Sequence, residues 1–135
     1  MRKKVLFVCT HNAARSQMAE GYMNARYSDR YEAFSAGTAP GTLNPHAVRA
    51  MAELGIDISG HRSKDLGEFD EQEMDFLVAV CEGGIRPFFP RAKGEIHREF
   101  PDPLNLAGTG DEIMADVRRI RDEVTIRIDT AFGAV

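Results

Sequence analysis

The fold is decided by residues 4–16, KVLFVCTHNAARS. The first part of this stretch, Lys4 to Cys9, is a compact run of β-branched and aromatic residues, which is typical of a buried strand. The next residues are small and polar, and from Arg15 onward apolar residues recur near helical spacing. This order predicts a strand, a short loop and a helix, with a cysteine at the carboxyl end of the strand.

The rest of the chain continues the alternation of strands and helices. Asn44 before Pro45 suits a helix N-cap followed by proline at the first helical position, and Gly55 ends that helix. We expect the remaining elements to be strands at Tyr31–Ser35, Phe76–Val80 and Ile96–Phe100 and a closing amphipathic helix at Asp111–Ile128. This pattern favours an α/β fold, a three-layer α/β/α sandwich with a four-stranded parallel sheet whose ligands bind at the carboxyl ends of the strands.

Length and composition limit the possible functions. At 135 residues, 43% of them hydrophobic, the chain is long enough for one compact domain and too short for two, so one domain is expected over residues 1–135. No apolar run approaches the roughly 20 residues that span a bilayer, which predicts a cytoplasmic protein with no membrane partner. The net charge of −4 comes from 17 basic and 21 acidic residues that are mixed along the chain, which argues against a nucleic-acid partner.

Cysteine and histidine usage favours individual reactive groups over a metal site. The chain has 2 cysteines, Cys9 and Cys81, whose wide separation fits neither a disulfide framework nor a zinc pattern. None of the 4 histidines is paired at the helical i, i+4 spacing. We therefore expect no metal, with His11 tuning the charge of the loop and the other histidines, His61 among them, acting as ordinary surface or capping groups.

The loop after the first strand has the properties of an anion cradle. Backbone N–H groups of a strand-to-helix loop converge on its concave side, and the helix amino terminus adds donors and a positive dipole end. Small side chains at Ala13 and Ala14 let the backbone approach an anion closely. The candidate oxyanion-binding residues are Thr10, His11, Asn12, Ala13, Ala14, Arg15 and Ser16.

Each polar side chain of this segment has an expected role. The field of the loop stabilises a Cys9 thiolate, to which Ser16 adds a hydroxyl donor. Arg15 presents two parallel N–H groups to two oxygens of a ligand, and Asn12 tolerates the left-handed backbone that a tight loop demands. Asp102 between two prolines is the candidate proton donor, because proline makes the surrounding loop rigid.

At these residues the chain resembles a known family. Residues 8–21, VCTHNAARSQMAEG, are similar to the active-site signature of low-molecular-weight protein tyrosine phosphatases and of the arsenate reductases that share their fold. Residues 17–21, QMAEG, are more similar to the reductase branch, because the phosphatases usually have proline after the serine. Further matches lie at residues 35–37, 44–45 and 55–59, so the resemblance covers nearly the whole chain.

The resemblance implies a specific redox reaction. Cys9 would attack arsenate bound by the loop and Arg15, with Asp102 assisting the loss of hydroxide. Cys81 would then attack Cys9, which releases arsenite and leaves a Cys9–Cys81 disulfide. The resemblance implies no bound cofactor, and an external thiol reductant, such as thioredoxin, glutaredoxin or a small thiol, would reduce this disulfide.

Two departures from the family pattern bear on the mechanism. Residues 82–89, EGGIRPFF, hold no third cysteine, which thioredoxin-coupled arsenate reductases carry there, so the usual relay of three cysteines is broken. Lys64 stands where potassium-binding reductases have an acidic ligand, so its ammonium group is expected in that space.

Two other functions remain open at this point. One is a phosphatase that hydrolyses phosphotyrosine through a phosphocysteine on Cys9, which needs no second cysteine. Residues 104–106, LNL, lack the aromatic residues that line the phosphatase slot after the Asp-Pro pair. The other is a binding protein that senses an oxyanion or an oxidant through Cys9 without turnover.

Overall fold

The computed structural model describes residues 2–69, 71–80, 92–97 and 108–133. The described elements are β1 (Lys3–Cys9), α1 (Arg15–Arg26), β2 (Tyr31–Gly37), α2 (Pro45–Ala52), the 3-10 helix η1 (Leu66–Phe69), β3 (Met74–Ala79), β4 (Ala92–His97) and α3 (Gly110–Phe132). None of the described helices is both long enough and apolar enough to cross a bilayer.

The sheet has 4 parallel strands in the order β2-β1-β3-β4. Phe7 of β1 aligns with Ser35 of β2 on one side and with Val78 of β3 on the other. The residue that ends β1, Cys9, therefore lies at the carboxyl edge of the sheet between two neighbouring strands. The α/β class and the four-stranded parallel sheet are confirmed.

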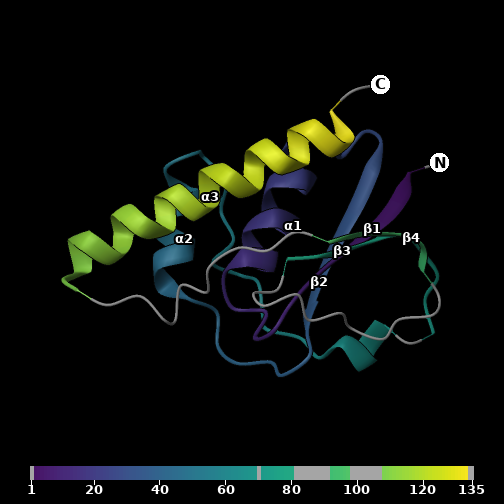
Figure 1. Cartoon of the computed structure of the whole chain (residues 1–135), viewed down its shortest axis with the longest axis horizontal. Coiled ribbons are helices and arrows are strands. Elements are labelled where there is room, and N and C mark those ends of the chain that lie inside the picture. Colours follow the sequence, from purple (N-terminus) through teal and green to yellow (C-terminus); the bar gives the residue numbers. More distant parts are fainter. Residues whose placement is uncertain (1, 70, 81–91, 98–107, 134–135) are drawn as a thin grey trace.

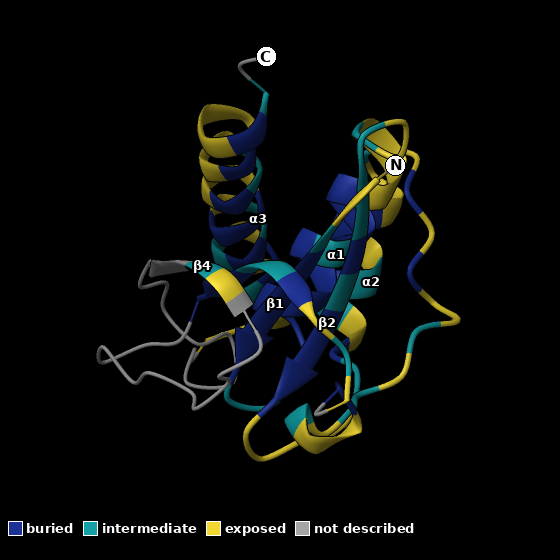
Figure 2. Cartoon of the chain, turned by 90° about the vertical axis from the view of Figure 1, so that its right-hand side faces the viewer, coloured by how far each residue is buried: buried dark blue, intermediate teal, exposed yellow. Residues whose placement is uncertain are grey.

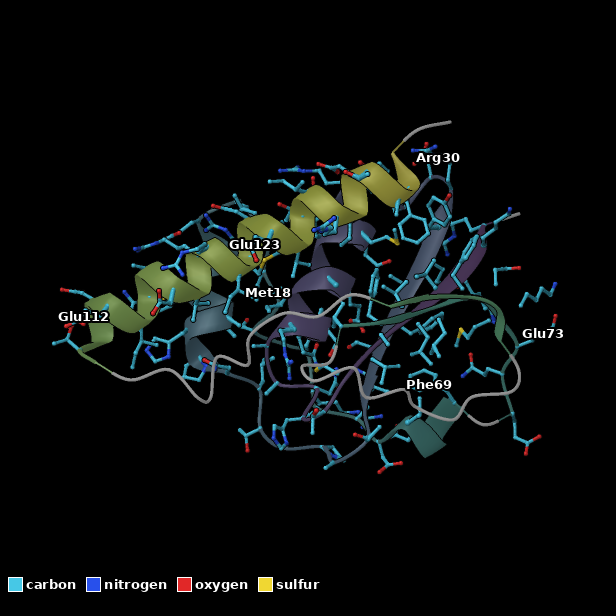
Figure 3. All side chains as sticks on the ribbon, viewed as in Figure 1. Met18, Arg30, Phe69, Glu73, Glu112 and Glu123 are labelled. Carbon is cyan, nitrogen blue, oxygen red and sulfur yellow. The ribbon has the colours of Figure 1, made fainter. Side chains whose placement is uncertain are left out.

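The helices α1, α2 and α3 pack on one face of the sheet, and α3 lies across the other two (Figure 1). Phe7, Met18 and Met51 are fully or almost fully buried between these layers. The opposite face carries Leu6 and Leu77 against Phe69 of η1. Figure 3 shows Met18 and Phe69 on these different sides, and Figure 2 shows buried strands beneath an α3 whose outer face is exposed. Burying each such side chain contributes roughly 1.5–3 kcal/mol.

The local sequence signals explain most helix boundaries. The side chain of Asn44 accepts the His46 N–H at 2.8 Å, and Pro45 opens α2 as expected. The turn after α2 contains Gly55 with φ of 76°, a left-handed conformation that favours glycine. Thr109 caps α3 by accepting the Glu112 N–H at 3.2 Å.

The fourth strand differs from the sequence prediction. It begins at Ala92 and the described part ends at His97, whereas Ile96–Phe100 was expected, and residues 98–100 lie outside the described part. The first half, Ala92 to Glu95, contains lysine, glycine and glutamate, so it has no apolar run to reveal it. Pairing with β3 determines this strand, because Gly94 aligns with Phe76 at the edge of the sheet.

Candidate active site

The candidate site occupies the loop between β1 and α1. Cys9, the last residue of β1, is 1% exposed, and Arg15, the first residue of α1, is 2% exposed. Arg15 donates from Nη1 to the Val80 carbonyl at 3.4 Å, just beyond the end of β3. The cysteine and the arginine therefore border one loop at the carboxyl edge of the sheet, as the sequence predicts.

The carbonyl groups of this loop all point outward. Surrounding groups donate to them in turn: Thr38 N to Cys9 O at 3.3 Å, Ala39 N to Thr10 O at 2.8 Å, Gly41 N to His11 O at 2.9 Å, Gln17 Nε2 to Asn12 O at 3.1 Å, Asn44 N to Ala13 O at 2.9 Å and Met18 N to Ala14 O at 2.8 Å. In a trans peptide the N–H opposes the preceding C=O. Outward carbonyls therefore turn the following N–H groups toward the inside of the loop.

The amino terminus of α1 has no side-chain cap. Its N-cap is Ala14, which makes no capping hydrogen bond through its side chain. Ala13 and Ala14 are each 4% exposed, and their N–H groups have no hydrogen-bond partner within the part of the chain that the structure describes. Buried donors at the positive end of a helix dipole form a site for an anion.

Two donors lie next to the sulfur. Ser16 Oγ is 2.8 Å from Cys9 Sγ, and the Asn12 N–H donates to the same sulfur at 3.2 Å. Asn12 adopts φ of 49°, and among the described residues it alone, apart from glycine, has positive φ. The hydroxyl of Ser16 and the N–H of Asn12 therefore converge on the sulfur of Cys9.

The direction of these hydrogen bonds is fixed by one backbone donor. The Lys64 N–H donates to Asn12 Oδ1 at 2.8 Å, which identifies that atom as the amide oxygen. Asn12 Nδ2 therefore faces Ser16 and donates to its Oγ at 2.7 Å. Ser16 Oγ accepts this bond, so its own proton is available for the sulfur of Cys9.

A second amide continues this network behind the loop. Gln17 Nε2 lies 2.9 Å from Asn12 Oδ1 and 2.8 Å from Arg62 O, both acceptors, so Gln17 Oε1 faces His61 Nδ1 at 2.9 Å. His61 Nδ1 must then carry a proton, and the same atom is 3.3 Å from Glu20 Oε2. His61 is thus part of the support of the loop, not the ordinary surface or capping group expected from sequence.

Lys64 approaches the same carboxylate. Lys64 Nζ lies 3.7 Å from Glu20 Oε1 and donates to Arg62 O at 3.0 Å. A potassium ion beside Glu20 would have to share this place with a lysine ammonium group. The donor set at Glu20 therefore does not fit a potassium ion, in agreement with the expectation from the Lys64 position.

The end of β2, at Gly37, approaches the candidate site closely. A Cβ atom on Gly37 would lie 2.7 Å from Thr10 O and 2.9 Å from Asn12 N. Ser63 Oγ donates to His11 O at 2.8 Å, and His11 Nδ1 donates to Ala39 O at 3.0 Å, because a carbonyl can only accept. Two neighbouring segments thus hold the outer side of the loop.

The structure places the predicted site residues as follows. All of the seven candidate oxyanion-binding residues, Thr10 to Ser16, lie in the loop and the first turn of α1 with Cys9. Cys81 and Asp102 lie outside the described residues. The described ranges contain no cluster of three His, Cys, Asp or Glu side chains that could hold a metal ion. No spacing or periodicity in the sequence indicates the supporting roles of Gln17, Gly37, Ser63 and Lys64.

Comparison with known proteins identifies the family. The family model described as low molecular weight phosphotyrosine protein phosphatase matches residues 4–125. Arsenate reductase from Halalkalibacterium halodurans is 41% identical over 133 residues, covering 96% of each chain, and that from Shouchella clausii is 43% identical, covering 95% of this chain and 94% of the relative. A solved arsenate reductase in the phosphate binding state is 29% identical with a TM-score of 0.78, covering 97% of each chain. The chain belongs to the low molecular weight phosphotyrosine protein phosphatase family.

Proposed function

We propose that this chain is an arsenate reductase in which Cys9 is the nucleophile and the loop from Thr10 to Ser16 binds the oxyanion. The observation that carries the proposal is the arrangement around Cys9 Sγ, with Ser16 Oγ at 2.8 Å and the Asn12 N–H at 3.2 Å at the uncapped start of α1. The full-length similarity to arsenate reductases at 41% and 43% identity supports this choice of reaction.

In the first step the thiolate of Cys9 attacks the arsenic atom of bound arsenate. A sulfur–arsenic bond forms and one oxygen leaves as hydroxide or water, with Asp102 proposed as the proton donor. Arg15 and the inward N–H groups stabilise the charge on the remaining oxygens. The guanidinium of Arg15 is buried, and its charge-assisted hydrogen bonds to a bound oxyanion are stronger than neutral ones.

In the second step the thiolate of Cys81 attacks the sulfur of Cys9. The sulfur–arsenic bond breaks, its electron pair stays on arsenic, and arsenite leaves as a Cys9–Cys81 disulfide forms. Arsenic gains two electrons and the two cysteines lose two. A thiol reductant from outside the chain, either a thioredoxin- or glutaredoxin-like protein or a small thiol, then reduces the disulfide, which suits a cytoplasmic enzyme with 2 cysteines in one domain of residues 1–135.

The test follows both the product and the thiols. Reduced protein is incubated with arsenate, arsenite release is measured, and the protein is analysed by thiol titration and mass spectrometry. We expect arsenite together with a loss of two protons that maps to a bond between Cys9 and Cys81. Cys9→Ser should release no arsenite. The variant Cys81→Ser should form no such bond, and it should release arsenite only when a small thiol is added.

The alternative function is hydrolysis of a phosphate ester by the same loop, which the family match also fits. Here Cys9 would form a phosphocysteine that water hydrolyses, without any role for Cys81. Two free thiols after arsenate treatment, combined with hydrolysis of an aryl phosphate, would replace the reductase proposal with this one. One stable modification of Cys9 per chain without product release would instead indicate a sensor.

A further inference from the structure

Behind the active-site loop lies a rear cluster of three charged or titratable side chains, Glu20, His61 and Lys64. The side chains of Glu20 and Lys64 are only 12% and 14% exposed, and His61 is 24% exposed. Glu20 comes from the second turn of α1, whereas His61 and Lys64 come from the segment after α2. The three side chains thus come from two segments that are distant in sequence, and the fold brings them together.

Lys64 links the rear cluster to the loop through both its backbone N–H and its side-chain ammonium group. Its backbone N–H fixes Asn12 Oδ1 at 2.8 Å, and its Nζ lies 3.7 Å from Glu20 Oε1 and 3.0 Å from Arg62 O. Arg62 O also accepts from Gln17 Nε2, which in turn bonds Asn12. A shift of the Lys64 ammonium group would therefore reach Asn12 through Arg62 O and Gln17 Nε2.

The charge of the rear cluster affects the negative charge that the active-site loop can hold. The site gathers negative charge, first the Cys9 thiolate and then the oxyanion, and a poorly hydrated carboxylate nearby disfavours both. Glu20 thus needs a positive partner. A histidine supplies one only when it is protonated, whereas the Lys64 side chain ends in an ammonium group.

We propose that the Lys64 ammonium group is the internal cation of this site, so that the loop needs no monovalent cation from solution. Lys64 acts as a positioning residue: its ammonium group neutralises Glu20 and donates to Arg62 O, which keeps in place the backbone N–H of Lys64 that holds Asn12. The proposal rests on the function of the loop as an oxyanion site and goes beyond it. Lys64 contacts Glu20, Arg62 and Asn12, and it acts on the sulfur through them.

The first test compares Lys64→Met, which keeps the length but removes the charge, with Lys64→Arg, which keeps the charge. The readouts are the rate of Cys9 alkylation by iodoacetamide at pH 7 and the protection of Cys9 by inorganic phosphate. We expect alkylation to slow and protection to weaken by about tenfold each in Lys64→Met, and by no more than about twofold in Lys64→Arg. Lys93→Met, which removes an exposed partner of Glu73 on β4, should match the unmutated protein.

A double variant separates charge from packing. If Lys64 acts by neutralising the carboxylate, Lys64→Met/Glu20→Gln should recover both readouts to within about threefold of the unmutated protein. A purely structural lysine would leave the double variant as impaired as Lys64→Met, and that result overturns the proposal. Circular dichroism checks that each variant is folded. If Lys64→Met alone does not fold, the comparison of Lys64→Arg with the double variant still decides whether Lys64 acts through its charge.

The cation requirement is tested on the unmutated protein. Alkylation and phosphate protection are measured in sodium, potassium, ammonium and tetramethylammonium chloride at one ionic strength. Equal values in all four support an internal cation, and a clear dependence on potassium or sodium contradicts it. Failure of phosphate to protect unmutated Cys9 would instead count against the oxyanion function, whereas the alkylation rates judge Lys64 independently of turnover.

Discussion

Asn12 donates its backbone N–H to Cys9 Sγ at 3.2 Å while its side chain donates to Ser16 Oγ at 2.7 Å. One residue therefore supplies a direct and an indirect hydrogen bond to the same sulfur. It does so from the left-handed conformation, with φ of 49°, which costs most residues about 1–2 kcal/mol and asparagine less. The amide bonds to Lys64 N and Gln17 Nε2 hold that conformation in place.

Asn12→Ala should remove the side-chain bonds and add left-handed strain, whereas Asn12→Gly removes the bonds without the strain. We expect the alkylation rate of Cys9 at pH 7 to fall by about 10- to 100-fold in Asn12→Ala and by a smaller factor in Asn12→Gly. Equal rates for the two variants would mean that backbone strain plays no part. An unchanged rate in both would mean that Asn12 does not set the state of the sulfur.

Gly37→Ala should displace the loop, because the new Cβ would meet the backbone at Thr10 O and Asn12 N within 3 Å. Backbone atoms cannot move aside as a flexible side chain can, so we expect a stability loss of about 1–3 kcal/mol together with slower alkylation of Cys9. Gly60→Ala is the matched control, since nothing lies within 4 Å of its Cβ position. Urea unfolding of both variants measures the difference, and equal stabilities would contradict the close approach.

The sequence predicts the first βα unit well, because that unit depends on local signals. The apolar run before Cys9 and the helical spacing after Arg15 put the loop where the structure has it. The caps and turns at Asn44 and Gly55 are also local. The strand Ala92–His97 was placed too late, since its pairing with β3 determines it and its own residues do not.

The support of the loop could not be predicted from the sequence for the same reason. Asn12 and Lys64 are far apart along the chain and meet only because the segment after α2 returns beneath the loop. No periodicity marks a buried glutamine such as Gln17 as the link between them. The sequence predicts the candidate oxyanion-binding residues, and the folded chain reveals the hydrogen bonds that hold them in place.

Ser16→Ala should leave the fold intact and make Cys9 less reactive. The variant loses the 2.8 Å contact to the sulfur, and a hydrogen bond to a charged group contributes about 1.5–3 kcal/mol. We therefore expect Cys9 alkylation and arsenite release to fall by about 10- to 100-fold, with stability changed by less than about 1 kcal/mol. Ser28→Ala, in the exposed turn after α1, is the control and should change neither rate. Normal reactivity in Ser16→Ala would show that the Asn12 N–H alone suffices.

Ser35→Ala should be neutral or stabilising despite complete burial. The Ser35 hydroxyl has no hydrogen-bond partner in the described part of the chain, so its removal ends the cost of burying an unsatisfied group, up to about 1–3 kcal/mol. Ser63→Ala is the contrasting variant, because Ser63 Oγ donates to His11 O at 2.8 Å and accepts from Gly41 N at 3.0 Å. We expect a loss of about 1 kcal/mol there in urea unfolding. A comparable loss in Ser35→Ala would mean that its hydroxyl has a partner after all.

Glu53 should make the stability of the protein depend on pH in the acid range. It joins α2 to α3 by accepting Arg118 Nη2 and Arg121 Nη1, both at 2.8 Å, and these bonds lower the pKa of its carboxyl from 4.5 to about 2. The folded pKa lies below the unfolded one, so the unfolded chain binds the proton more readily between these values. The stabilisation is therefore complete above about pH 4.5 and is lost as the pH falls through about 2.

The measurement compares Glu53→Gln with the unmutated protein in urea at pH 7, 4 and 2.5. We expect the variant to be less stable at pH 7 and the difference to shrink steadily toward the lowest pH, because protonation removes the same charge that the variant lacks. Glu123→Gln is the control on the outer face of α3 (Figure 3), where the glutamate is exposed. A difference between Glu53→Gln and the unmutated protein that does not vary with pH would mean that the glutamine disturbs packing, and that the ion pairs do not join the two helices.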